Sequence, residues 1–216
     1  MKKLNKETCE IIGAFIGDGY MWSYGKNKNK AAVGFVGHKI DDEDYIKIYL
    51  KKIIIKNFPK SNPRIYYRTD EKTIRLIDYS GEIANFLKEM GFNPGKKTKT
   101  VKIPEIIIKN KNLVNFTLRG IYDTDGCVFF DQRKAYSKPY PRVVLESYSS
   151  SLITQIHNLL SDKFKIYLNK RKSRDGQIIE IYGHQQLEKF LKHIGFSNKK
   201  HISKCPCGLA VRALSR

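Results

Sequence analysis

The sequence contains two copies of one unit, and this duplication constrains the fold more than any single motif does. The segment from Ile74 to Phe92 reads IRLIDYSGEIANFLKEMGF, and the segment from Ile178 to Phe196 reads IIEIYGHQQLEKFLKHIGF. Earlier in each copy, the apolar spacing between Ile46 and Phe58 matches that between Leu152 and Phe164. Earlier still, IIGAFIGDG at 11–19 matches LRGIYDTDG at 118–126. Three matching blocks in the same order indicate a true internal repeat.

Each copy has the pattern helix, two strands, helix, two strands, helix. In the first copy an apolar helix runs to about residue 18, strands follow near 20–24 and 31–37, and a helix with 3–4 apolar spacing opens at 41–44. Strands near 64–68 and 73–79 precede a helix that ends at Gly91. We expect an α+β fold of two αββαββα repeats, residues 1–95 and 112–216, joined by a Lys-rich connector at 96–111. The repeats should pack about a pseudo-twofold axis as one compact unit.

The chain is strongly basic, with 41 Lys and Arg against 21 Asp and Glu, a formal net charge of +20. Such an excess favours a polyanionic partner, nucleic acid above all. No apolar stretch approaches the ~20 residues of a membrane span, and the N-terminus lacks a signal-peptide core. Four cysteines do not suggest a disulfide scaffold, so we expect an intracellular protein without a membrane partner.

The matched nine-residue segments have the character of buried helices that pack on each other. Gly13 and Gly17 lie four positions apart, so they share one helix face on which a second helix backbone can approach closely. Gly120 and the bulkier Thr124 take the corresponding places in the second copy. We expect the glycines that follow, at positions 19 and 126, to end the helices in a left-handed conformation.

Asp18 and Asp125 therefore fall at helix C-termini, where the helix dipole disfavours a carboxylate. A pseudo-twofold axis through the helix pair brings the two carboxylates side by side, and they repel each other unless a cation or a shared proton intervenes. A hard divalent cation bound by carboxylate, carbonyl and phosphate oxygens resolves this conflict. Such metals also serve phosphodiester hydrolysis.

IIGAFIGDG and LRGIYDTDG resemble the LAGLIDADG motif, and the paired repeats resemble the single-chain LAGLIDADG homing endonucleases over nearly the whole chain. The resemblance implies a monomer with the motif helices at the interface and two saddle-shaped antiparallel sheets that bind a long duplex DNA site. It also implies Mg²⁺- or Mn²⁺-dependent cleavage of both strands, leaving short 3′ overhangs, by an enzyme encoded in a mobile intron or a similar element. The metal would be held by Asp18 and Asp125, with Gly17 and Thr124 as further ligands.

The family usually adds one basic residue in each half, after the last helix. Counting from the Gly-Phe pair that ends each copy, Lys96 corresponds to Lys200, and both are candidate catalytic residues. Each has a lysine neighbour, Lys97 or Lys199, so the choice within each pair stays open. Two motif positions depart from the pattern: Asp123 is interpreted as non-catalytic, and Arg119 as the mark of a partly exposed helix edge.

The predicted strands and turns carry basic and aromatic residues that fit a DNA-binding surface. Alternate residues of a strand share a face, and a two-stranded ribbon fits the major groove. The candidates in the first half are Tyr20, Trp22, Tyr24, Lys26, Lys28, Lys30, Arg64, Tyr66, Arg68, Lys72 and Arg75. Those in the second half are Arg133, Lys134, Tyr136, Lys138, Tyr140, Arg142, Lys170, Lys172 and Arg174.

Other clusters are interpreted structurally. The acids at 41–44 suit a helix N-terminus better than a second metal site. His201, Cys205 and Cys207 have too few ligands and unusual spacing for zinc, so no zinc is expected. No Gly-rich phosphate loop is present, so no nucleotide cofactor is expected either.

Two rival functions use the same scaffold. An RNA-binding intron maturase would keep the basic surface but need neither aspartate, and a catalytically silent DNA-binding regulator typically loses one or both. Retention of Asp18 and Asp125 favours the nuclease. A chain embedded in an intein is disfavoured, because there is no starting Cys or Ser and no terminal His-Asn pair.

Overall fold

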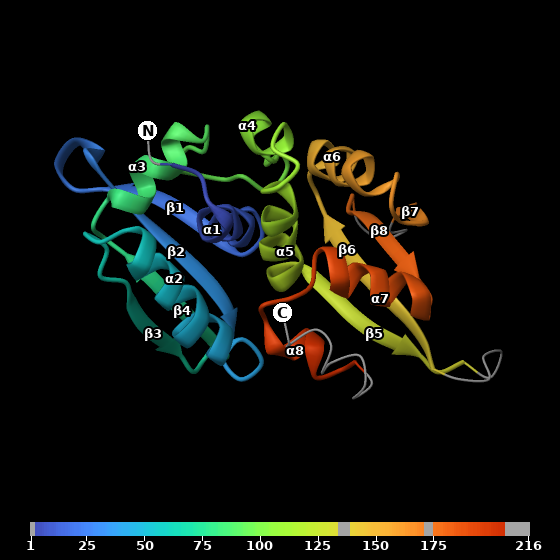
Figure 1. The fold of residues 1–216 in the computed structure, drawn as a ribbon. Coiled ribbons are helices and arrows are strands. Elements are labelled where there is room, and N and C mark those ends of the chain that lie inside the picture. The colour runs from blue at the N-terminus through green and yellow to red at the C-terminus, as the bar shows by residue number, and fades with distance from the viewer. Residues whose placement is uncertain (1–2, 134–138, 171–174, 206–216) are drawn as a thin grey trace.

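Two similar halves lie side by side in the computed structural model, which describes residues 3–133, 139–170 and 175–205. The first helix of each half lies at the centre of the molecule, and the two helices pack against each other (Figure 1). The remaining elements of each half extend outward from this pair (Figure 1).

The first repeat follows the order predicted from the sequence, with strand bounds within a few residues of those expected. Its elements are α1 (Lys6–Ile16), β1 (Gly19–Tyr24), the 3₁₀ turn η1 (Lys26–Lys28), β2 (Lys30–His38), the π-helical η2 (Tyr45–Leu50), α2 (Lys51–Asn57), β3 (Arg64–Arg68), β4 (Thr73–Asp78) and α3 (Glu82–Glu89). Helix α1 begins in a capping box, because Asn5 accepts from the Thr8 amide and the Thr8 hydroxyl accepts from the Asn5 amide.

The second repeat has the same order, preceded by a short helix in the connector. The elements are α4 (Glu105–Ile108), α5 (Val114–Thr124), β5 (Gly126–Asp131), β6 (Tyr140–Ser147), α6 (Ser150–Leu160), β7 (Ile166–Lys170), β8 (Gln177–Tyr182), α7 (His184–His193) and α8 (Lys199–Ile202). The predicted α+β class and the repeated αββαββα pattern are therefore confirmed.

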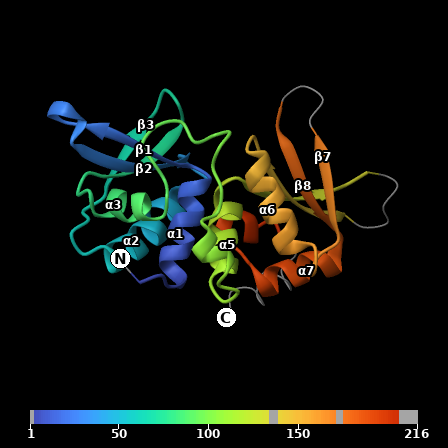
Figure 2. The same ribbon diagram turned by 90° about the horizontal axis from the view of Figure 1, so that it is seen from above.

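Each repeat forms one four-stranded antiparallel sheet, with strand order β1-β2-β4-β3 in the first and β5-β6-β8-β7 in the second. Apolar side chains on one sheet face pack under the helices, as Met21 and Phe35 do in the first repeat and Val128 and Leu145 in the second. Seen from above, the helices lie on one side of the molecule and the strands on the other (Figure 2). One face of each sheet is thereby left uncovered by helices (Figure 2).

Helices α1 and α5 approach so closely that glycine is required at their contact. A methyl group on Gly13 would lie 2.1 Å from the carbonyl oxygen of Thr117, and one on Gly120 would lie 2.2 Å from that of Glu10. The glycine face thus allows the close approach of a second helix that the sequence predicts. Close contact also explains Gly17, where a methyl group would lie 2.0 Å from Oγ1 of Thr124.

The expectation for the glycines after the motif aspartates is wrong. Gly19 and Gly126 have no left-handed conformation; they are the first residues of β1 and β5. Each strand starts directly against the helix before it, so that a methyl group on Gly19 would lie 2.5 Å from Cα of Phe15, and one on Gly126 would lie 2.3 Å from the carbonyl oxygen of Tyr122. Space, rather than backbone conformation, selects glycine at both positions.

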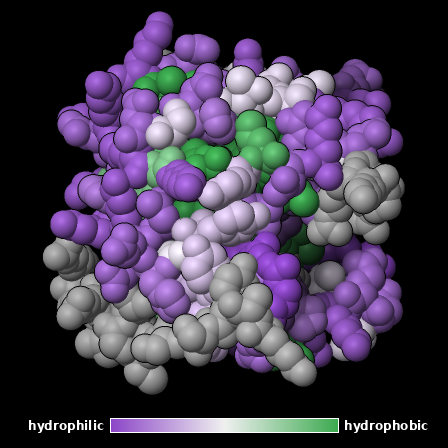
Figure 3. Space-filling view, turned by 90° about the vertical axis from the view of Figure 1, so that its right-hand side faces the viewer, coloured by the Kyte–Doolittle hydropathy of each residue, from purple (hydrophilic) through white to green (hydrophobic). Residues whose placement is uncertain are grey.

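The outer surface of the second repeat is mainly hydrophilic. Figure 3 shows this side, where polar residues surround a limited apolar patch. Within the described part of the chain, no helix combines the length and the apolar composition that crossing a bilayer requires.

Candidate active site

Asp18 and Asp125 follow the C-terminal ends of α1 and α5, the two helices that cross at the centre of the molecule. The ends lie against each other, because a methyl group on Gly17 would come within 3.3 Å of Cγ of Asp125. Asp18 is half-buried, and Asp125 is exposed on its solvent side. The packing of two small-residue helix faces therefore places two carboxylates in one region.

Both carboxyl groups resist ionisation. Desolvation raises the pKa of Asp18 to about 6, and the nearby Asp42 carboxylate adds to this, while Lys200 and Lys97 oppose it. The pKa of Asp125 is raised to about 7, by desolvation first and by the charge of Asp18 second. Water reaches one side of Asp125, which weakens the effect of desolvation there. We therefore attribute the raised pKa of Asp125 mainly to repulsion from Asp18. A bound cation would favour the ionised form of both groups.

Lys97, and not Lys96, reaches the end of α1. Its ammonium group donates to the carbonyl oxygens of Ile16 at 2.5 Å and Gly17 at 2.6 Å, whereas Lys96 is exposed. Desolvation lowers the pKa of Lys97, and the charges of Asp125 and then Asp18 counteract this. The structure therefore moves the candidate lysine of the first repeat from position 96 to position 97.

The one-residue difference comes from unlike chain paths after α3 and α7. In the first repeat Gly95 has a φ of +118° and its amide donates to the carbonyl of Met21. In the second repeat Asn198 caps α8 by accepting from the amide of Lys200. A count from the Gly-Phe pair cannot detect this change, because the number of residues between the pair and the lysine differs between a turn and a capped helix.

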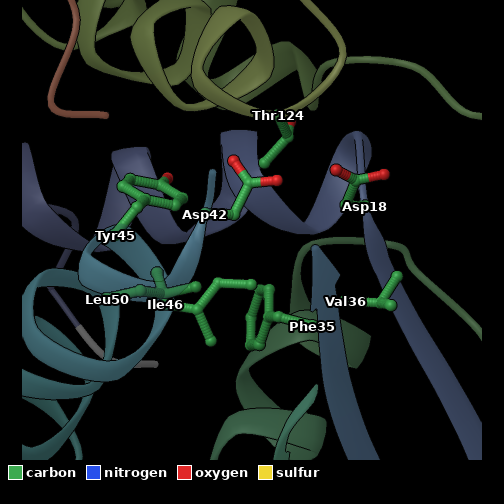
Figure 4. Close-up of a pocket in the computed structure, with 8 residues that line it drawn as sticks. All are labelled: Asp18, Phe35, Val36, Asp42, Tyr45, Ile46, Leu50 and Thr124. Carbon is green, nitrogen blue, oxygen red and sulfur yellow. The ribbon is translucent and has the colours of Figure 1, made fainter. Parts of the chain in front are cut away.

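Lys200 lies where the sequence placed it, but its closest partner is an acid of the other repeat. Its ammonium group is 2.7 Å from Oδ1 of Asp42, and Lys199 beside it is exposed. Asp18, Asp42 and Thr124 surround one small pocket whose apolar side is formed by residues of β2 and η2 (Figure 4). Among the lysines, Lys200 has the largest effect on Asp18, whereas Lys97 has the largest effect on Asp125. Each half-site thus combines residues of both repeats.

The half-site around Asp125 contains an acid that the sequence analysis did not single out. Glu146, near the end of β6, lines an open pocket of about 350 Å³ together with Lys97 and Asp125. Its distance from Asp125 along the chain hides this proximity. Strand pairing supplies it, because β6 lies beside β5, which begins directly after Asp125.

The donor set around the aspartates consists of oxygen atoms. Gly17, one of the predicted further ligands, offers a carbonyl that already accepts from Lys97. Thr124, the other, directs its hydroxyl back to the carbonyl oxygens of Gly120 and Ile121. Within 3–133, 139–170 and 175–205, no three His, Cys, Asp or Glu side chains gather as a complete protein-only metal site. Two carboxylates suit a divalent cation that completes its coordination shell with substrate phosphates, as Mg²⁺ usually does.

The motif residues that depart from the pattern belong to a buried polar network. Asp123 is fully buried and accepts from the amides of Ser197 and Asn198, which agrees with a structural role. Burial and the neighbouring charge of Glu10 raise its pKa well above the usual range. Arg119 is half-buried, as predicted for a helix edge, and donates to the carbonyl oxygen of Ile194.

His201 is part of the same network. Its Nε2 lies 3.2 Å from the carbonyl oxygen of Asp123, and its ring stacks on Phe196. The thiol of Cys205 is directed at the carbonyl oxygen of His201, while Cys207 lies outside the described residues. Burial lowers the pKa of His201 to about 4.

The acids at 41–44 lie before η2, as expected, but none caps it through its side chain. Asp42 accepts instead from the His38 amide, and the other side chains pair with neighbours on the surface. These pairs are Asp41 with His38, Glu43 with Lys47 and Tyr67, and Asp44 with Lys199. The capping interpretation is corrected accordingly.

The open face of the first sheet collects the predicted aromatic and basic residues. Strand register places Tyr20, Trp22 and Tyr24 on this face, opposite Gly34, Ala32 and Lys30. Tyr20 stacks on Trp22 at 5.3 Å, and its ring covers Gly34. Tyr79, which the sequence analysis did not include, packs edge-on against Trp22 and Tyr24.

The basic residues of this sheet stand beside the aromatic row. By alternation, Arg64, Tyr66 and Arg68 share the open face with Arg75. Arg68 and Arg75 both pair with Glu71 in the β3–β4 turn, which holds the two guanidinium groups in place. Lys26, Lys28 and Lys72 lie in the hairpin turns at the sheet ends.

The second sheet has a more mixed open face. Arg142 lies 2.6 Å from Asp131 and 3.7 Å from Glu180, and Tyr140 shares its face. Arg133 pairs with Asp131. Lys170 alternates onto the opposite face, with Leu168, so its assignment to this surface is corrected. The candidates Lys134, Tyr136, Lys138, Lys172 and Arg174 lie outside the described residues.

Comparison with known proteins agrees with this architecture. The model of the family described as LAGLIDADG-like domain matches residues 112–195. The replication factor C small subunit of Methanocaldococcus jannaschii is 27% identical over 207 residues, which are 93% of this chain and 10% of that protein. The chain thus spans about a tenth of that relative.

Solved structures extend the fold match to both repeats. Variants of the homing endonuclease I-DmoI align with a TM-score of 0.66 at 15% identity, covering 96% of each chain. I-DmoI in complex with DNA and Ca aligns at 0.64, with 15% identity and the same coverage. I-WcaI bound to its DNA recognition sequence aligns at 0.62, with 16% identity over 99% of this chain and 88% of that one. Residues 112–195 thus match the LAGLIDADG-like domain model, and the chain as a whole has the two-repeat fold of the homing endonucleases I-DmoI and I-WcaI.

Proposed function

We propose that this protein is a site-specific DNA endonuclease of a mobile intron or similar element, which acts as a monomer and cuts both strands of a long duplex site with Mg²⁺ or Mn²⁺. The observation that carries the proposal is the pair of composite half-sites, Asp18 with Lys200 and Asp125 with Lys97, at one end of the central helix pair. A single chain thereby presents two similar sets of hydrolytic groups, as the cutting of two strands requires.

The reaction in each half-site is hydrolysis of a phosphodiester. A water molecule loses a proton as its oxygen bonds to phosphorus, the bond from phosphorus to the leaving sugar oxygen breaks, and that oxygen gains a proton. Lys97 and Lys200 supply positive charge beside the phosphate, where negative charge increases in the transition state. When bound, a divalent cation would polarise the phosphate and lower the pKa of bound water.

Asp18 and Asp125 are the residues that would hold this cation. Desolvation raises the pKa of both groups, and the charge of Asp18 raises that of Asp125 further, so a bound cation would stabilise the ionised form of each. Structures of the relative I-DmoI have been determined in complex with DNA and with Ca or Mn. We therefore infer that the two aspartates bind a divalent metal ion together with a DNA phosphate.

The open faces of the two sheets supply the DNA-binding surface. In the first repeat, Arg64, Tyr66 and Arg75 share the open sheet face with the stacked Tyr20 and Trp22. Arginines on a strand face can contact base edges in the major groove, while lysines in the turns contact phosphates. The net charge of +20 adds affinity that decreases with rising salt.

A cleavage selection tests the proposal directly. The wild-type protein and the Asp18→Asn/Asp125→Asn double variant are incubated with a randomised duplex library and Mg²⁺, and the cut ends are sequenced. We expect one enriched site, cut in both strands by the wild type alone. Salt-dependent binding of DNA or intron RNA without any cut ends would instead support the regulator or the maturase.

A further inference from the structure

The ion pair between Asp42 and Lys200 joins the two repeats at the candidate active site. Asp42 precedes η2 in the first repeat, and Lys200 lies in α8 at the end of the second. Their charged atoms are 2.7 Å apart, and the side chains are 9% and 21% exposed. A lysine has a long flexible stem, so a fixed acid at its end decides where the ammonium group lies.

Asp42 is itself held rigidly. One carboxylate oxygen accepts from the amide of His38 at 2.8 Å, and the other accepts from the side-chain amide of Asn198 at 2.7 Å. Asn198 is 1% exposed and is anchored in turn by Asp123, to which its backbone amide and its side chain both donate. The Asp42 carboxylate is therefore a pre-organised partner and not a mobile surface acid.

The other half-site has no matching acid at the corresponding position. The match of Ile46–Phe58 to Leu152–Phe164 places Tyr148 at the position of Asp42, and its neighbour Ser149 donates to the carbonyl oxygen of Val101 at 2.6 Å. Lys97 is held by the carbonyl oxygens of Ile16 and Gly17 instead. The two candidate catalytic lysines thus have chemically different supports.

We propose that Asp42 is a positioning residue that holds Lys200 beside Asp18, so that one of the two strand cuts depends on Asp42 and the other does not. This inference rests on the proposed nuclease function. In this proposal Asp42 contacts neither phosphate nor metal. It acts only by fixing the position of the Lys200 ammonium group. Specific loss at one strand follows, because Lys97, the lysine with the larger effect on Asp125, is held by the carbonyl oxygens of Ile16 and Gly17 and not by Asp42.

The chain offers a matched control. Asp44 also precedes η2 and also pairs with a lysine of α8, Lys199 at 3.4 Å, but both side chains are more than half exposed. Asp44→Asn removes the same charge from the same segment and breaks a contact between the same two elements. It leaves the lysine beside Asp18 in place.

The first experiment measures the cleavage rate of each strand separately, on a duplex target labelled at both 5′ ends. We expect Asp42→Asn to change the ratio of the two rates by about tenfold or more, and Asp44→Asn to change it by less than about twofold. Partial unfolding lowers both rates together and leaves their ratio unchanged. Lys200→Met should slow the same strand, and Asp42→Asn should have no further effect on the ratio in that background. An unchanged ratio in Asp42→Asn, with the wild type cutting normally, would overturn the inference and leave the nuclease intact.

The second experiment does not depend on cleavage. In ¹⁵N-lysine-labelled protein, a hydrogen-bonded ammonium group gives a protected Nζ–Hζ signal, which Lys200→Arg assigns. We expect that signal in the wild type and in Asp44→Asn and its loss in Asp42→Asn. If the signal behaves in this way but the wild type never cuts DNA, the ion pair is real and the nuclease proposal is what fails. Persistence of the Lys200 signal in Asp42→Asn would contradict the positioning role.

Discussion

The ammonium group of Lys97 donates a hydrogen bond of 2.6 Å to the carbonyl oxygen of Gly17, the residue before Asp18. A lysine that follows the last helix of the first repeat is thereby tied to the end of its first helix. The contact brings a positive charge to the region where the two motif aspartates meet, and it separates Lys97 from its exposed neighbour Lys96.

Lys97→Met should reduce cleavage by about a hundredfold or more, because the charge beside the phosphate is lost. Lys96→Met removes the same charge one residue away and should stay within about threefold of the wild type, since this side chain is exposed. Single-turnover cleavage rates on the selected target compare the two. Equal losses in both variants would show that the lysine contributes only to general phosphate binding.

Asp18→Asn and Asp125→Asn should each abolish double-strand cleavage while duplex binding survives, because each removes a carboxylate that the metal requires. Gel-shift affinity in Ca²⁺ and cleavage in Mg²⁺ are measured on the same target. Asp162→Asn, on an exposed residue after α6, is the charge-matched control and should behave as the wild type. Full cleavage by either site variant contradicts the assignment.

Cleavage at limiting Mg²⁺ should increase with pH between about 5.5 and 8. The pKa values of about 6 for Asp18 and about 7 for Asp125 leave both groups partly protonated at the lower end, and the ionised forms bind metal. A raised carboxyl pKa means that the metal-binding form is lost as pH decreases. Because metal competes with protons, a higher Mg²⁺ concentration should shift the rate profile to lower pH. A profile that stays in place over a large range of Mg²⁺ argues against metal binding by these carboxylates.

Gly13→Ala should destabilise the protein by about 1–3 kcal/mol, the usual cost of overpacking. The added methyl group would meet backbone atoms of α5, including the carbonyl oxygen of Thr117 at 2.1 Å, which cannot move without shifting the helix. Chemical unfolding of the variant is compared with that of Lys88→Ala, on the exposed side of α3. A neutral effect of Gly13→Ala would mean that the helices can separate freely.

Replacement of His201 by Phe should remove an acid-dependent loss of stability. The pKa of this buried ring is lowered from 6.5 to about 4, so the unfolded chain binds a proton between these values and the folded chain does not. The stabilising effect is complete above pH 6.5 and is lost as pH falls toward 4, by up to ~3 kcal/mol. The free energy of unfolding is measured for His201→Phe and for the wild type from pH 7 to 4. As pH decreases, the variant should become more stable relative to the wild type. A difference that stays constant over this range would exclude His201 as the titrating group.

The sequence alone determined the repeat, the order of the elements and the two aspartates. These features are local: Gly13 and Gly17 share a helix face because of helical periodicity, and Arg64, Tyr66 and Arg68 share a strand face because side chains alternate. The matched copies then required a symmetric arrangement, which brought Asp18 and Asp125 together.

Tertiary structure decided which side chains surround the aspartates. The turn at Gly95 and the cap at Asn198 select Lys97 and Lys200, strand pairing brings Glu146 beside Asp125, and packing between repeats delivers Asp42 to Lys200. These contacts join residues far apart in the chain, and a change of one residue in a turn shifts them. No local periodicity encodes such distances, so only the packing of the two repeats against each other could fix them.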